Sequence, residues 1–104
     1  MTYAQDPIEK EKIQYLISSI ENLKNAAFIR NGSVHDGKGA ANHLRMKLQK
    51  AGEKVQTADD FIRLCASKSY VSGTPYTIQY TNGKTIKSEE FLREKLMEYK
   101  PSVK

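Results

Sequence analysis

The sequence predicts a small α+β domain in which three helices are followed by a β-hairpin and a C-terminal helix. Apolar residues recur at helical spacing in four segments, and capping residues, glycine or proline bound these segments. A β-branched and aromatic run at 76–80 is followed by Asn82-Gly83 and a second short run, which is a hairpin pattern. We expect one domain over residues 1–104, with a flexible N-terminus at 1–6 and a flexible C-terminal tail at 101–104.

The first two helices are placed by their end signals. An acidic cap and a proline begin the first helix, which we expect over residues 7–26. Asn31-Gly32 then turns the chain, and Ser33 with Asp36 three residues later predicts a cap for a helix that starts near Val34. The regular part of this second helix is expected over 40–51 and ends at Gly52.

The second half of the chain carries the clearest local pattern. Thr57 and Asp60 form a capping box that opens the third helix. Strands at 76–80 and 84–87 are joined by Asn82-Gly83, which predicts a type I′ turn because both positions favour positive φ. Ser88 is then expected to cap the fourth helix.

The charge is basic and unevenly distributed. The chain has 17 Lys and Arg against 12 Asp and Glu, which gives a net charge of +5. Most of the excess lies in residues 31–56, so a face of this region can attract phosphates or carboxylates. No apolar run approaches the roughly 18 residues of a membrane-spanning helix.

The residues with reactive side chains exclude some chemistry. His35 and His43, the two histidines, are eight positions apart, or about 12 Å along a helix, so they cannot chelate one metal ion. Cys65 is the only cysteine and falls on an apolar helix face, where a thiol packs as a small hydrophobe. One enzymatic alternative remains, a hydrolase-like or transferase-like site that pairs His43 with Ser67 or Ser69.

An ordered set of short motifs resembles the YfeK-like family of uncharacterised exported bacterial proteins. The resemblance covers residues 13–97 and rests on Phe28-Ile29-Arg30-Asn31-Gly32-Ser33, His43-Leu44-Arg45-x-Lys47-Leu48, Thr57-Ala58-x-x-Phe61-Ile62, Ala66-Ser67-x-Ser69 and Ser72-Gly73-x-Pro75-Tyr76-x-Ile78. It implies no activity. It implies a periplasmic or secreted protein, and Thr2-Tyr3-Ala4 resembles the end of a cleaved signal peptide. Gly37 and Gly39 depart from the family pattern, as does Phe91, which stands where Trp is expected.

These observations favour a non-enzymatic binding module of the cell envelope, without metal or cofactor, whose partner is another protein or an anionic envelope component. A nucleic-acid-binding domain is a further alternative, because six tyrosines accompany the positive charge. The candidate binding residues are the polar residues of the shared motifs, which fall at element ends and loops: Arg30, Asn31, Ser33, His43, Arg45, Ser67, Ser69, Ser72 and Tyr76.

Overall fold

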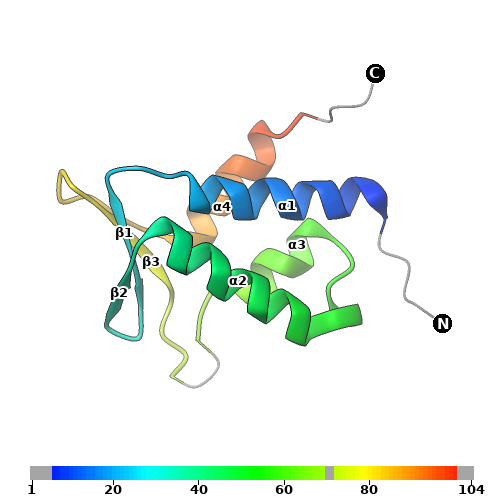
Figure 1. Cartoon of the computed structure of the whole chain (residues 1–104), viewed down its shortest axis with the longest axis horizontal. Coiled ribbons are helices and arrows are strands. Elements are labelled where there is room, and N and C mark those ends of the chain that lie inside the picture. Colours follow the sequence, from blue (N-terminus) through cyan, green and yellow to red (C-terminus); the bar gives the residue numbers. More distant parts are fainter. Residues whose placement is uncertain (1–5, 70–71, 101–104) are drawn as a thin grey trace.

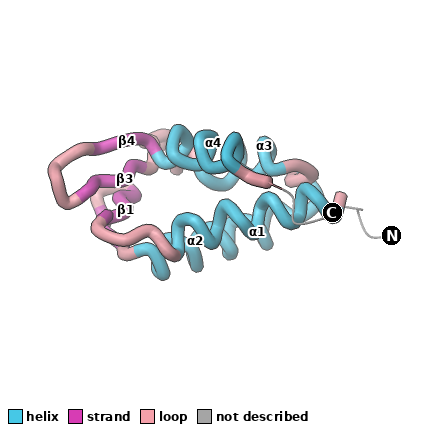
Figure 2. The backbone as a smooth tube through the Cα atoms, turned by 90° about the horizontal axis from the view of Figure 1, so that it is seen from above, coloured by secondary structure: helices cyan, strands magenta, loops and turns pink. Residues whose placement is uncertain are grey.

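Two layers of helices and a four-stranded antiparallel sheet make up the domain in the computed structural model (Figure 1). The structure describes residues 6–69 and 72–100, so most of the two expected tails lies outside the described residues. Figure 2 shows α1 (Pro7–Glu21) and α2 (Gly37–Ala51) in one layer, with α3 (Ala58–Phe61) and α4 (Ser88–Glu98) in the other. The sheet closes one end of both layers.

The first helix begins as predicted but ends early. The Asp6 carboxylate accepts a hydrogen bond from the Ile8 amide at 2.8 Å, and Pro7 occupies the first helical position. The helix stops at Glu21, whereas the prediction extended it to residue 26. Asn22 is the C-cap residue of the helix, and the positive φ of 59° at Asn25 is incompatible with a helix as far as residue 26, where the chain enters a strand.

That strand is β1 (Ala26–Arg30), and it forms a hairpin with β2 (Ser33–His35) that the sequence analysis missed. Asn31 and Gly32 have φ of 53° and 80°, so this turn is the type I′ turn of the chain. The prediction placed that turn at Asn82-Gly83, where only Gly83 has a positive φ, 92°. There the Gly83 amide donates to the Tyr80 carbonyl, and glycine takes the left-handed bulge position of a longer loop.

The sheet has the strand order β2-β1-β3-β4, with β3 at Thr77–Tyr80 and β4 at Thr85–Lys87. Phe28 pairs with His35 on one side and with Ile78 on the other, so these side chains share a face. Phe28 and Ile78 are buried, and this face therefore packs on the helices. The opposite face carries Val34, which is 67% exposed.

The start of α2 differs from the prediction. Asp36, not Ser33, caps the helix, and its carboxylate accepts from the Gly39 amide at 2.8 Å. A Cβ at Gly37 would lie 2.8 Å from backbone oxygens at the end of α1, so only glycine permits this close approach. The helix ends before Gly52, which adopts a φ of 56° as expected for its C-terminal cap.

The remaining helices extend the core. The capping box of Thr57 and Asp60 is present at α3, as predicted, and the chain continues as a π-helical segment, Ile62–Ala66. A 3-10 turn, Gly52–Lys54, precedes α3. Ser88 was expected to cap α4, but Lys87 is the N-cap residue and Ser88 is the buried first residue of the helix. The α+β class is therefore confirmed, whereas the element order is α-β-β-α-α-β-β-α with short 3-10 and π segments.

Candidate functional site

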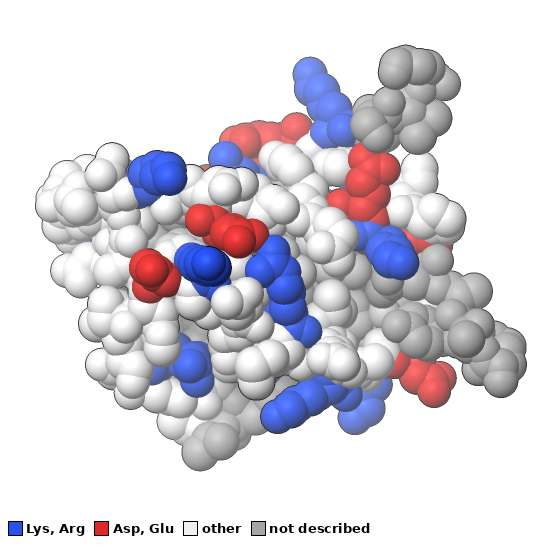
Figure 3. Space-filling model, viewed as in Figure 1, with Lys and Arg blue, Asp and Glu red and all other residues white. Residues whose placement is uncertain are grey.

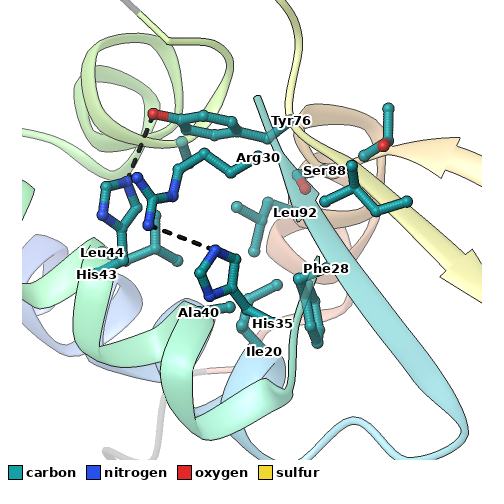
Figure 4. A pocket seen from close by; sticks show the side chains of 13 residues that line it. Ile20, Phe28, Arg30, His35, Ala40, His43, Leu44, Tyr76, Ser88 and Leu92 are labelled. Carbon is teal, nitrogen blue, oxygen red and sulfur yellow. Dashed lines mark hydrogen bonds between the residues drawn. The ribbon is translucent and has the colours of Figure 1, made fainter. Parts of the chain in front are cut away.

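A small pocket lies between the first hairpin, α2 and the start of β3 (Figure 4). Its volume is about 40 Å³. The floor is apolar and includes buried side chains from α1, β1, α2, the π-helical segment and α4, which are Ile20, Phe28, Leu44, Ala66 and Leu92. The polar lining residues are Arg30, His35, His43, Tyr76, Thr77 and Ser88.

Arg30 and His35 come from the two strands of the hairpin. The Nη2 atom of Arg30 lies 3.4 Å from Nε2 of His35, and Figure 4 shows the two side chains facing each other across the pocket. The type I′ turn at Asn31-Gly32 brings these strands together at a fixed register. The hairpin therefore places a guanidinium and an imidazole beside the same pocket.

His43 and Tyr76 form a second contact in the lining. Nε2 of His43 lies 3.5 Å from Oη of Tyr76, and the two rings meet edge to face with centroids 5.8 Å apart. Nζ of Lys47 donates to the same Tyr76 oxygen at 3.0 Å and lies 5.1 Å from the ring centroid. Tyr76 is only 7% exposed, so it fixes α2 against the chain that enters β3.

The electrostatic environment keeps His43 neutral at pH 7. Burial and then, in decreasing order of effect, electrostatic repulsion from Arg30, Lys47, His35 and Lys50 together lower the pKa of His43 from 6.5 to about 4. Among the described residues that line the pocket, none carries a carboxylate. The described lining thus contains the positive charge of the Arg30 guanidinium and no carboxylate, and Nζ of Lys47 lies 3.0 Å from the hydroxyl of the lining residue Tyr76.

A second polar cluster, outside the pocket lining, holds the hairpin to the loop that precedes β3. Nδ2 of Asn31 donates to Oγ of Ser69 at 3.2 Å, and Oγ of Ser72 donates to Oδ1 of Asn31 at 2.6 Å. Oγ of Ser72 also accepts from the Thr74 amide at 3.2 Å. These three predicted residues therefore tie the Asn31-Gly32 turn to the chain before β3.

The other predicted residues lie elsewhere. Arg45 forms an ion pair with Glu21 at 2.6 Å, on the side of α2 that faces α1. Oγ of Ser67 donates to the Arg63 carbonyl, and Ser33 is exposed in β2. The structure thus brings Arg30, His43 and Tyr76 to one pocket, with Asn31, Ser69 and Ser72 beside it, and leaves Ser33, Arg45 and Ser67 outside. A binding role for all nine stays a prediction.

Neither His35, which lines the pocket, nor Lys47, which donates to the lining residue Tyr76, was predicted as a binding residue. His35 was considered only as a metal ligand, and Lys47 only as part of the overall charge. The proximity of Lys47 to His43 could have been predicted from the sequence, because positions 43 and 47 are neighbours on one helix face. The signal for His35 required the first hairpin, which pairs it with Phe28 and so directs it toward the pocket.

The described contacts of His43 join it to Tyr76 rather than to Ser67 or Ser69, which bond to Arg63 and Asn31 respectively. Cys65 is buried, and burial raises the pKa of its thiol, which disfavours the reactive thiolate. Over the described ranges, there is no group of three or more side chains suited to hold a metal ion. In the same part of the chain, no helix has the length and apolar character needed to cross a membrane.

The surface charge is mixed on the face formed by α1 and α2. Figure 3 shows Lys and Arg atoms interspersed with Asp and Glu atoms on this face. Ion pairs such as Arg45–Glu21 and Lys12–Glu9, at 2.6 and 3.0 Å, account for part of this pattern. This face is not the uniformly basic surface that attracts a nucleic-acid backbone to a protein.

The fold and pocket define a small α+β domain with a cationic, apolar-floored pocket. Residues 7–100 match a family of unknown function, DUF5329, and the chain belongs to that family. It is also 35% identical over 68 residues to the "Uncharacterized protein YfeK" of Salmonella typhimurium strain LT2, which agrees with the resemblance seen in the motifs. The match covers 65% of this chain and 57% of that protein's length. No solved structure matches the chain.

Proposed function

We propose that the protein is a non-enzymatic binding module of the bacterial cell envelope, and that its pocket binds a small anionic group. The observation that carries the proposal is the Arg30 guanidinium in a described lining without a carboxylate, with the ammonium group of Lys47 held 3.0 Å from the hydroxyl of the lining residue Tyr76. Like charges held close together repel one another, and an anion between them relieves that repulsion. The pocket is therefore a better host for an anion than for a cation or a neutral polar group.

The rigidity of the surrounding structure supports this proposal. Tyr76 receives a hydrogen bond from Lys47, and Asn31 bonds to two serines of the loop before β3. A site whose side chains are already held in place loses little conformational entropy when a ligand binds. Arg30 and His35 can thus be presented to a ligand without rearrangement of the hairpin.

Envelope location is supported by the motif resemblance and by the similarity of Thr2-Tyr3-Ala4 to the end of a signal peptide. The full-length gene product, expressed in its bacterial host, should appear in the periplasmic fraction or the medium. N-terminal sequencing of that material should begin at Gln5. Recovery of an uncleaved protein from the cytoplasm would refute this part of the proposal.

Anion binding is tested by isothermal titration with phosphate, sulfate and acetate at low ionic strength. Arg30→Gln should abolish binding, because it removes the guanidinium from the pocket and keeps an uncharged polar side chain there. Arg45→Gln is the matched control, because Arg45 pairs with Glu21 outside the pocket, and this variant should bind as the wild type does. Equal loss in both variants would show that only the overall charge matters, and absence of binding to every anion would refute the proposal.

A further inference from the structure

The pocket lining combines a positive charge with apolar side chains, and a simple inorganic anion uses only the positive charge. Its lining includes the polar side chains of Arg30 and His35 and, to their right in Figure 4, the apolar side chains of Phe28 and Leu92. Phe28 and Leu92 are almost wholly buried, with 5% and 0% exposure. A ligand that pairs with Arg30 therefore lies next to apolar lining.

The space above this floor is small but not negligible. One water-sized group needs about 12 Å³ of such space, so the pocket volume of about 40 Å³ admits about three groups of that size. The apolar part of this lining is a poor place for water, because a water molecule against Phe28 or Leu44 finds no hydrogen-bond partner in those side chains. Apolar carbon atoms suit it better, and only a short chain fits.

We propose that the ligand is a carboxylate that carries a short, branched apolar tail, either a free small acid or the C-terminal residue of a peptide. This inference rests on the proposed function and specifies the anion. The carboxylate lies beside Arg30 and His35, and the tail rests against Phe28 and Leu44.

The guanidinium geometry favours a carboxylate. Arginine presents a planar fork of N–H donors that matches the two oxygens of a carboxylate. The present contact between Nη2 of Arg30 and Nε2 of His35 is 3.4 Å, longer than the usual distance of about 2.9–3.0 Å. Exchange of this long contact for a charge-assisted hydrogen bond to a carboxylate is therefore favourable.

The apolar floor sets the expected order of affinities. Each methyl or methylene group that moves from water onto the floor should tighten binding about fourfold. Propionate should thus bind about 4 times, and isobutyrate about 16 times, more tightly than acetate. Octanoate should lose this gain because its chain exceeds the available volume.

The experiment is an NMR titration of the whole chain with acetate, propionate, isobutyrate, octanoate and inorganic phosphate, monitored at the Arg30 and His43 side chains. Isobutyramide is the matched neutral ligand, with the same tail and no charge. The peptide Gly-Gly-Val, with a free or an amidated C-terminus, distinguishes the two sources. A peptide that binds more tightly than isobutyrate and loses binding on amidation assigns the ligand to a peptide C-terminus, whereas equal or weaker binding assigns it to a free acid.

The outcomes separate this inference from the proposed function. The predicted result is an increase in affinity from acetate to isobutyrate and no saturable binding of isobutyramide. If phosphate and acetate bind as tightly as isobutyrate, the apolar tail has no role and this inference is overturned, while anion binding stands. If no anion binds, both fail.

A variant provides an independent test. Ala40 lines the pocket from α2, and Ala40→Leu adds apolar volume there without a change in charge or helix propensity. This variant should lose the preference for isobutyrate over acetate but still bind acetate through Arg30. Retention of the full preference in a variant that melts as the wild type does would overturn the inference.

Discussion

The stability of the domain should depend on pH through His43. In the folded protein, burial and the nearby cations lower the pKa of this imidazole from 6.5 to about 4. Above pH 6.5 the ring is neutral in both the folded and the unfolded chain, and stability is at its maximum. Between pH 6.5 and about 4 the unfolded chain binds a proton that the folded chain does not, so the free energy of unfolding falls as the pH falls.

The magnitude follows from the size of this pKa change. At about 1.36 kcal/mol for each pKa unit, a drop from 6.5 to about 4 corresponds to at most about 3 kcal/mol. The ring is partly exposed, and water screens part of the repulsion from Arg30 and Lys47. We therefore expect a loss of about 1–2 kcal/mol between pH 7 and pH 4 from this residue.

The assay is urea denaturation followed by circular dichroism, since the chain has no tryptophan to report unfolding. The wild type and His43→Gln are compared at pH 7 and pH 4. The titration of carboxylates affects the stability of both proteins equally and cancels when the two are compared. The free energy of unfolding of the wild type should therefore fall by about 1–2 kcal/mol more than that of the variant. His35→Gln is the control that retains His43 and the pH dependence. Equal losses in the wild type and His43→Gln would refute the reasoning.

The same denaturation assay tests the packing of two helices, and hydrogen exchange tests the loop before β3. Gly37→Ala places a methyl group 2.8 Å from the carbonyl oxygens of Ile20 and Glu21, so it should cost about 1–3 kcal/mol; an unchanged midpoint would contradict this packing. Thr57→Ala removes the capping hydrogen bond of α3 and should cost about 1 kcal/mol, whereas Thr57→Ser should restore most of it. Asn31→Gly keeps the positive φ but loses the bonds to Ser69 and Ser72, so amides of that loop should exchange faster, and unchanged exchange would show that these bonds do not hold it.

The sequence predicted those elements whose signals are local. Asp6 and Thr57 cap helices because their side chains accept hydrogen bonds from backbone amides two or three residues further along the chain. Gly52 ends α2 because it adopts a positive φ. The β1–β2 hairpin was missed because Leu23 and Ala27 continue the helical spacing of α1. The register of β1 against β3, in which Phe28 pairs with Ile78, joins residues 50 positions apart, and no local pattern reveals such a contact.

The candidate site, like the fold, could be predicted only in part from the sequence. Arg30, His43 and Tyr76 were selected because they belong to the shared motifs, and they meet in one pocket. Their proximity depends on the missed hairpin and on the entry of the chain into β3, so it could not be derived from spacing. The apolar floor comes from five different segments, and its existence depends on side-chain packing alone.

The most direct test of anion binding in this pocket is an NMR measurement of the pKa of His43 with and without acetate. In the free protein, the ring should titrate near pH 4. An anion held between Arg30 and His35 neutralises positive charge beside the ring, so saturating acetate should raise this pKa measurably toward 6.5 in the wild type and leave it unchanged in Arg30→Gln. A pKa that is the same with and without acetate at constant ionic strength would contradict the account.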